Sequence, residues 1–391
     1  MKLRHLIPTA VATILMAACG GGGGISGTGM QENGTMRLHI TDAPACGYDA
    51  VNVTVQKVRV NRDPAAAESD AGWQEIVLAP ANRVDLLTLT NGVLMELGQA
   101  DLPAGRYTQL RLVLAENDAA NPLANSVVPT GGSEVALTTP SGQQSGLKVD
   151  VGLEVPAGQE ADFVLDFDAC KSVVRRGNSG QYNLKPVLTV SPLLADAGLR
   201  VTGYVDPAIA LATTQVSVQQ GGVPVKATTP DPLTGRFVLY PLPAGNYDLV
   251  LSAAGRATAV IAGVPVASGV PTAVNTSAAG LLRPPLAQPL RSVAGTLTPA
   301  TGTLRALQSI SAGPTVEVAW AAVDPTSGDF EFMLPSDPPV RSQWTGTGFA
   351  PFSADTAAAA HYTLQAAAGA VTKNVPVDTS APVPPLAITV P

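Results

Sequence analysis

Two aspartates in one predicted strand are the best candidates for binding chemistry. If the aromatic and aliphatic side chains of residues 161–168 face the core, Asp166 and Asp168 share the opposite face. Neighbouring carboxylates repel one another unless a cation lies between them. Calcium takes about six to eight oxygen ligands, and Asp42, in the turn after an earlier strand, could supply a third carboxylate. The alternative is a solvated strand edge that pairs with the cations of Lys171, Arg175 and Arg176.

The sequence has no spaced Asp-x-Asp-x-Asp-Gly loop, which favours the solvated edge, and we assign no metal and no cofactor. Residues for nucleophilic catalysis are scarce. His39 and His361 are the histidines beyond residue 18, they lie in different predicted domains, and no Gly-x-Ser-x-Gly elbow is present. Ser145 and Lys148 have the Ser-x-x-Lys spacing, but only a helix would place both on one face, and a strand is expected here. We therefore expect a protein that is not an enzyme.

Sugar binding needs an exposed aromatic ring, and the chain has 3 Trp and 4% aromatic residues. Trp73 is expected to begin a strand and Trp320 to end one, so core packing is expected for both. Trp344 lies in a glycine-rich loop that could present its ring to a ligand. Trp344 is therefore the aromatic residue that the sequence offers as a ligand contact.

The start of the chain carries the pattern of a targeting signal. Two basic residues precede an apolar run at 6–16 that is too short to span a bilayer, and two alanines supply small residues before Cys19. The stretch resembles a bacterial lipoprotein signal with its lipobox. The resemblance implies that residues 1–18 are removed and that a diacylglycerol on the Cys19 thiol anchors the chain in the membrane. The alternative is an ordinary secretory peptide with a cysteine at the cleavage site.

Residues 20–29 are almost all glycine, which predicts a flexible tether between the anchor and the first domain. By resemblance to Gram-negative lipoproteins, an aspartate directly after the lipidated cysteine favours retention in the inner membrane. The residue here is Gly20. We therefore expect the chain at the outer membrane, on its periplasmic face or at the cell surface.

If Cys19 carries the lipid, Cys46 and Cys170 are the two remaining thiols, an even pair in an oxidising compartment. Both follow predicted strands, at the ends of which the loops of one sandwich can meet. We expect a disulfide between them. The alternative is two separate buried thiols, because cysteine also serves as a small core residue.

Composition narrows the class of protein. The 391 residues include 23 Lys+Arg and 30 Asp+Glu, for a net charge of -7, whereas nucleic-acid binding needs a basic patch. No later apolar stretch reaches the roughly 20 residues of a membrane helix. The 38 Gly and 34 Pro favour short strands and turns over long helices. We expect an all-β chain of two or three tandem β-sandwich domains, immunoglobulin-like or transthyretin-like.

Alternating apolar and polar residues predict the strands of the first domain at 36–40, 51–60, 73–78, 84–89, 102–114, 135–138, 147–155, 161–168 and 182–190. The segments between and within them resemble the successive blocks of domain of unknown function family 4382. These blocks are Thr41-Asp42-Ala43-Pro44, Asp85-Leu86-Leu87-Thr88-Leu89, Leu102-Pro103-Ala104-Gly105-Arg106-Tyr107, residues 140–148, Asp166-Phe167-Asp168-Ala169 and Leu184-Lys185-Pro186-Val187. The resemblance covers residues 34–192 and implies a β-sandwich, found in secreted and lipid-anchored bacterial proteins, with no assigned activity.

A second domain is predicted at 198–280. Its turns Thr234-Gly235-Arg236-Phe237 and Leu242-Pro243-Ala244-Gly245-Asn246-Tyr247 resemble those of the carboxypeptidase regulatory-like, or transthyretin-like, domain. The resemblance implies a small seven-stranded sandwich with a structural or adhesive role. Prolines predict a stiff linker at 281–291, and residues 292–391 repeat the same pattern more loosely, which predicts a third, degenerate β-sandwich.

The predicted order is therefore a signal peptide at 1–18, the lipidated cysteine and tether at 19–33, and three β-sandwich domains. We predict a non-enzymatic lipoprotein of the cell envelope, a binding or structural module presented from the outer membrane. Its expected partners are the membrane and either an envelope protein or a glycan, not nucleic acid. The alternative is an accessory carbohydrate-binding or hydrolytic component that acts on polysaccharide or peptide.

Overall fold

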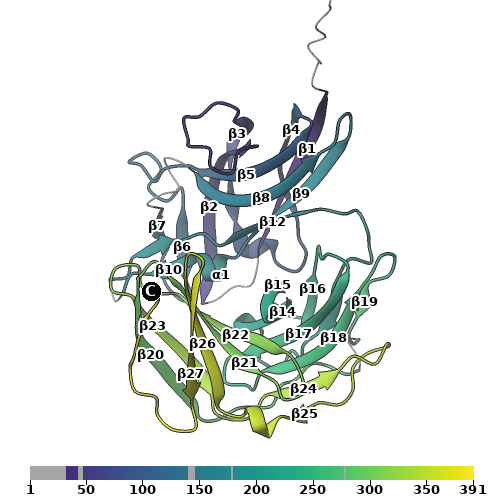
Figure 1. Cartoon of the computed structure of the whole chain (residues 1–391), viewed down its shortest axis with the longest axis vertical. Helices are drawn as coiled ribbons and strands as arrows, with labels where there is room; N and C mark the ends of the chain where they lie inside the picture. Colours follow the sequence, from purple (N-terminus) through teal and green to yellow (C-terminus); the bar gives the residue numbers. More distant parts are fainter. Residues whose placement is uncertain (1–31, 43–46, 140–145, 178, 277–278) are drawn as a thin grey trace, which may run out of the picture.

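The computed structural model describes residues 32–42, 47–139, 146–177, 179–276 and 279–391. Its regular structure is almost entirely β-strand, divided among several sheets, which confirms the predicted all-β fold of multiple sandwiches. The strands form three units, each with a hydrophobic core between two sheets. Figure 1 shows the first unit above the other two, which lie side by side.

The first unit contains twelve strands. They are β1 (Asn33–Asp42), β2 (Tyr48–Asn61), β3 (Gln74–Asp85), β4 (Met95–Pro103), β5 (Gly105–Leu114), β6 (Ser126–Pro129), β7 (Val135–Thr138), β8 (Leu147–Val155), β9 (Glu160–Phe167), β10 (Val173–Arg175), β11 (Tyr182–Leu184) and β12 (Leu188–Pro192). One sheet has the order β12-β9-β1-β4, and the other has the order β10-β11-β7-β6-β2-β5-β8, with β3 paired to β2.

The core of the first unit follows from strand alternation. Met36, Leu38 and Ile40 of β1 are fully buried, and the residues between them are half-buried on the other face. In β2 a bulge between Val55 and Lys57 shifts the alternation by one residue, so that the apolar side chains beyond it still face the core.

Two predicted strands of this unit are wrong in part. Residues 84–89 do not form one strand, because β3 ends at Asp85 and Leu86–Leu89 form a 3-10 helix. The Asp85 carboxylate accepts hydrogen bonds from the N–H groups of Leu87 and Val51, both at 3.1 Å, which turns the chain out of the sheet. The segment 182–190 is two strands in different sheets, separated at Pro186, which has no N–H for the ladder.

The second and third units have the same strand order. The second has the sheets β16-β13-β19 and β15-β14-β17-β18, and the third has β23-β20-β28 and β22-β21-β26-β27. Their bounds are β13 (Val201–Tyr204), β14 (Thr214–Gln220), β15 (Val223–Thr228), β16 (Arg236–Leu239), β17 (Gly245–Ala253), β18 (Ala259–Val266), β19 (Thr272–Ala273), β20 (Leu290–Thr298), β21 (Thr303–Ser309), β22 (Thr315–Ala321), β23 (Asp329–Pro335), β26 (His361–Ala368), β27 (Val371–Asp378) and β28 (Leu386–Thr389).

The same turn begins β16 and β23. Asp231 and Asp324 each accept hydrogen bonds from the N–H groups two and three residues ahead, and the turn closes at a glycine with positive φ. A Cβ on Gly235 would lie 1.9 Å from the Val205 carbonyl oxygen, and one on Gly328 would lie 2.3 Å from that of Leu297. Glycine is therefore required in both turns, because each must approach the first strand of its unit.

Two short strands join the second unit to the third. β24 (Val340–Gln343) and β25 (Ser353–Ala354) lie in sequence within the third unit, yet β24 pairs in parallel with β18 and extends the sheet of the second unit. The outer face of that sheet is also covered, since Val250 and Val260 belong to the core of the third unit. The second and third units therefore share one sheet, buried on both faces.

The predicted linker at 281–291 is not an extended spacer between these units. Leu282 is buried and forms a bridge with Val205, and Leu286 forms one with Arg256. The strand β20 already begins at Leu290. The proline-rich segment therefore lies against the second unit, with Leu282 buried and Leu286 exposed.

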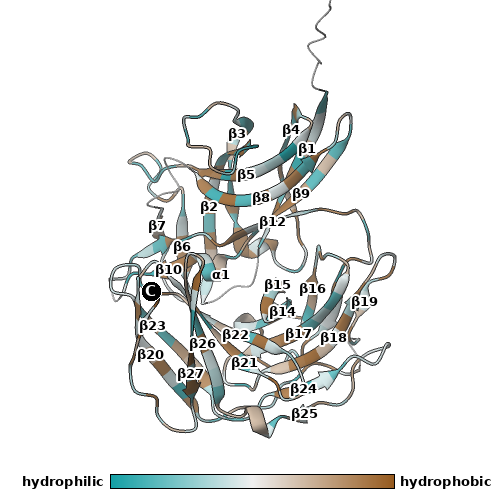
Figure 2. Cartoon of the chain, in the orientation of Figure 1, coloured by the Kyte–Doolittle hydropathy of each residue, from teal (hydrophilic) through white to brown (hydrophobic). Residues whose placement is uncertain are grey.

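Figure 2 shows hydrophobic residues alternating with hydrophilic ones along the strands of all three units. In the part of the chain that the structure describes, no helix is long and apolar enough to cross a membrane. Figure 1 also shows that β1 begins at the end of the first unit that faces away from the other two.

Candidate functional site

The first unit meets the other two through the residues that follow β9. Asp168 directly follows that strand and accepts a hydrogen bond from the N–H of Lys171 at 2.9 Å, which caps the short helix α1 (Ala169–Ser172). The Asp42 carboxylate, at the end of β1, accepts from the N–H of Ala169 at 2.9 Å. Two strand ends and one helical turn therefore fix the position of the Lys171 side chain.

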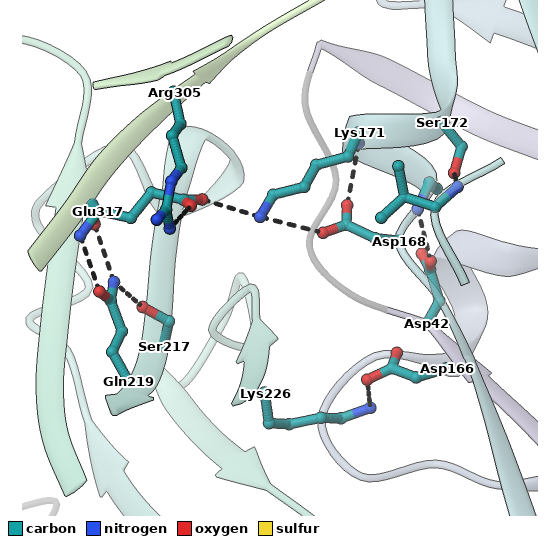
Figure 3. A network of polar contacts seen from close by, with 12 residues as sticks. Asp42, Asp166, Asp168, Lys171, Ser172, Ser217, Gln219, Lys226, Arg305 and Glu317 are labelled. Carbon is teal, nitrogen blue, oxygen red and sulfur yellow. Dashed lines mark hydrogen bonds and ion pairs between the residues drawn. The ribbon is translucent and has the colours of Figure 1, made fainter. Parts of the chain in front are cut away.

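Lys171 reaches from α1 into the third unit. Its Nζ lies 2.8 Å from Oε1 of Glu317 in β22 and 3.9 Å from Oδ2 of Asp168. The same ammonium lies 4.9 Å from the centre of the Trp320 ring, a cation–π contact. Arg305 Nη1, at 3.3 Å, contacts the other oxygen of Glu317. Figure 3 shows this row of charges crossing from one unit to the other.

The second unit holds the same glutamate by its backbone. The Gln219 side chain in β14 accepts from the N–H of Glu317 and donates to its carbonyl, both at 2.8 Å (Figure 3). The Ser252 hydroxyl in β17 donates to the Val318 carbonyl at 3.0 Å. These side chains satisfy the outer edge of β22 as a neighbouring strand would.

A second lysine joins the first unit to the second. Lys226 in β15 is 5% exposed, and its Nζ lies 2.7 Å from Oδ2 of Asp166. Asn91 adds a neutral contact, since its Oδ1 accepts from the N–H of Val238 at 3.1 Å. The first unit therefore contacts both other units through buried or half-buried polar side chains.

Burial shifts the protonation of the aspartates at this junction. Desolvation raises the pKa of Asp42 well above its usual range, against the hydrogen bond from Ala169 and with the help of the charges of Asp168 and Asp166. Desolvation also raises the pKa of Asp168 to about 6, although the charge of Lys171 lowers it. Asp42 is therefore expected to be protonated well into the range where surface aspartates are ionised.

A cavity of about 690 Å³ opens where the three units meet, and we name it the junction cavity. Its lining combines aromatic, aliphatic, hydroxyl and cationic side chains. Among them are Tyr48, Lys171, Arg256, Leu290, Trp320 and Met333. A volume of this size matches the pockets that hold small ligands.

The structure gives the three predicted calcium ligands other partners. Asp42 and Asp168 accept hydrogen bonds from N–H groups of α1, and Asp166 pairs with Lys226. No group of three or more His, Cys, Asp or Glu side chains in the described residues is arranged to hold a metal ion. The alternative of a solvated edge named one correct partner, Lys171, which pairs with Asp168, but these aspartates lie at a contact between units and are largely buried.

Two of the predicted tryptophans are both half-buried. Trp344 packs against the core of the second unit, onto which β24 carries its loop. Trp320, expected in a core, lines the junction cavity near the end of β22.

The other predicted residues lie apart from the junction or outside the described residues. Cys19 and Cys46 are outside them, as is Ser145. Cys170 lies in α1 and lines the junction cavity. His39 of β1 lies 3.4 Å from Asp162, and His361 is exposed at the start of β26.

Sequence reasoning missed Lys226 and Glu317. Both stand within apolar strand segments, Val-Pro-Val-Lys-Ala-Thr and Thr-Val-Glu-Val-Ala-Trp-Ala. A charged residue is rarely buried unless it is paired. A charged residue inside an apolar strand segment therefore indicates a buried ion pair. The partner could not be named, because it belongs to another unit.

Asp168→Asn should remove a pH dependence of stability. The folded-state pKa of Asp168, about 6, exceeds its usual 3.8, so the contribution of Asp168 to stability is fully present below about pH 4 and is lost as the pH rises through 6. The wild type should therefore lose about 3 kcal/mol relative to the variant over this interval. Asparagine can still accept the hydrogen bond from Lys171, so the cap is retained.

Urea unfolding of both proteins from pH 3.5 to 7, measured as a difference between them, tests this expectation. Asp150→Asn on the exposed face of β8 is the matched control and should show no such step. A difference between wild type and Asp168→Asn that stays constant with pH would contradict the assignment.

The comparison with known proteins finds a family match for the first unit. No curated protein matches the chain. Residues 33–186, from the start of β1 to the end of β11, match the model of a family described as a domain of unknown function, DUF4382. The N-terminal domain expected from the sequence is thereby supported: the first unit is similar to the members of the DUF4382 family.

Proposed function

We propose that this chain is a non-enzymatic lipoprotein of the cell envelope, a three-unit binding module anchored at the outer membrane through Cys19. One observation carries the proposal. Among the buried ionisable side chains at the junction, Lys171 pairs with Glu317 and Lys226 pairs with Asp166 across units, and Asp168 lies 3.9 Å from Lys171 within the first unit. Groups that are paired in this way hold domains in place, which favours a structural role over acid–base chemistry.

The arrangement of the units supports a presenting role. The lipid would be attached ahead of β1, which begins at the end of the first unit remote from the junction (Figure 1). The second and third units would then lie farther from the membrane than the first. The junction cavity between all three is the natural place for a ligand.

Features of the second unit support its resemblance to carboxypeptidase regulatory-like domains. Strands β13 to β19 are seven strands in two sheets, the number that the resemblance implies, and the turn at Gly235 and the Tyr247 hydroxyl bond to the Pro243 carbonyl at 2.7 Å lie in the two motifs that carry the resemblance. Membership of that family is part of the proposal. It favours binding over hydrolysis, since in carboxypeptidases this domain is a non-catalytic companion.

The runner-up is an accessory carbohydrate-binding component. The half-buried Trp320 in the junction cavity favours it, because an aromatic ring beside polar side chains suits a sugar. The two proposals share the anchor and the cavity, and they differ in the ligand.

Membrane fractionation tests the anchor. The wild type should be recovered with the outer membrane and should incorporate labelled fatty acid. Cys19→Ala should be neither lipidated nor cleaved at that site. Gly20→Asp serves as the matched variant, which should be lipidated and retained in the inner membrane. Recovery of wild type with the inner membrane, or as an unlipidated soluble species, would refute the proposal.

Within this proposal Cys46 and Cys170 form a disulfide. Cys46 lies outside the described residues, but the chain on both sides of it comes to Cys170. Asp42 contacts Ala169, and Gly47 lines the junction cavity together with Cys170. The bridge would close a loop of about 124 residues and stabilise the first unit by about 4 to 5 kcal/mol in the chain-entropy model.

Intact-mass analysis of the full chain tests the bridge. Unfolding and alkylation without reductant should modify neither Cys46 nor Cys170, and prior reduction should expose both. A Cys46→Ser/Cys170→Ser protein is the control for the mass and for the loss of stability. Alkylation of both residues in the unreduced wild type would show that no bridge exists.

A further inference from the structure

The junction cavity differs in charge from the rest of the protein. The chain has 30 acidic and 23 basic residues and a net charge of -7. Among the described residues, the charged side chains that line the junction cavity are by contrast two cations, Lys171 and Arg256, with no Asp or Glu. A cavity whose charged lining is cationic, in a chain that is acidic overall, favours an anionic ligand.

The two cations differ in how far they are already paired. Lys171 is already paired with two carboxylates, those of Glu317 and Asp168. Arg256 donates from Nη1 to the Pro284 carbonyl at 2.7 Å, and no carboxylate of the described residues lies within ion-pair distance of it. The nearby Asp206 pairs instead with Arg283 at 2.5 Å. Arg256 therefore has guanidinium N–H groups left for a carboxylate.

The remaining lining is suited to a ring with hydroxyl groups. Trp320 and Tyr48 are half-buried, so that part of each ring is accessible. Hydroxyl and amide side chains stand beside them; these are Thr213, Gln215, Ser252 and Thr258. Aromatic rings beside a few polar groups are typical of pockets that orient an amphipathic small ligand.

A peptide bound as an added strand does not fit this site. The edge of β22 beside the cavity would have to offer free N–H and C=O groups. Glu317 is hydrogen-bonded on both sides by Gln219, and the Val318 carbonyl accepts from Ser252. The edge is thus already satisfied by side chains of the second unit.

We propose that the junction cavity binds an acidic saccharide, with a sugar ring against Trp320 and the sugar carboxylate on Arg256. The inference rests on the carbohydrate-binding form of the proposed function and names its ligand class. Lys171 contributes positive potential at the same wall, while its ion pair with Glu317 keeps the three units in place.

Calorimetric titration of the full chain in detergent tests the ligand class. The probe is tetragalacturonate, and its fully methyl-esterified form keeps the sugar rings but lacks the charges. Tetragalacturonate should bind, and the ester should bind about tenfold more weakly or worse, the loss expected for a charge-assisted hydrogen bond. Tetraglutamate, which carries the charges without the rings, should also bind at least about tenfold more weakly.

Two variants test the location. Arg256→Gln should weaken tetragalacturonate binding about tenfold, and Trp320→Phe should weaken it about threefold. The matched controls are Arg236→Gln, an exposed arginine of the same unit, and Trp344→Phe, an aromatic outside the cavity. Both controls should bind as the wild type does. Thermal midpoints of all four variants show whether each is folded.

Three results would overturn the inference. These are no heat with millimolar tetragalacturonate, equal affinity for the ester or for tetraglutamate, or unchanged affinity in both cavity variants that remain folded. None of these results touches the anchor, which the fractionation of Cys19→Ala tests separately. Failure of that experiment would refute the proposed function whatever the titration shows.

Discussion

The ammonium group of Lys171 and its 2.8 Å contact with Glu317 join the first unit to the third. Glu317 is in turn fixed by Gln219 of the second unit through two hydrogen bonds. Transfer of two charges from water costs free energy, so such a pair contributes little net stability by itself. Its contribution is geometric, because buried charges must keep their partners, and this pair together with Lys226 and Asp166 fixes how the first unit lies against the other two.

The junction cavity is a consequence of that contact. Its walls come from α1 and the start of β2 in the first unit, from the end of β17 in the second, and from β22 and β23 in the third. Separation of the first unit would remove one wall and expose Lys171 and Trp320 to water. A ligand that contacts all walls would stabilise the assembled form by mass action. Binding and the joining of the units are therefore linked.

The local part of the fold could be predicted from the sequence, and the contacts between units could not. Alternation in β1 and the turn at Gly235 are set by neighbouring residues, which is why these features could be predicted from the sequence. The pairing of β24 with β18 is not set by neighbouring residues, because it joins segments about 80 residues apart in sequence through backbone groups that every residue carries. The packing of Trp344 against the second unit follows from that pairing.

The candidate site shows the same division. Asp166 and Asp168 were correctly singled out as carboxylates that need a cation, since their proximity follows from strand alternation. The cations turned out to be Lys226 and Lys171, and the predicted Arg175 and Arg176 contact neither aspartate among the described contacts. Lys226 lies in another unit, which no local pattern reveals.

Differential scanning calorimetry of the full chain tests most directly whether the three units form one body. Contacts through buried charges and a shared sheet should make them unfold together, so the wild type should give a single transition whose calorimetric and van't Hoff enthalpies agree. Lys171→Met should divide it, with the first unit melting before the other two. Separate transitions in the wild type, one of them matching the first unit, would contradict the account.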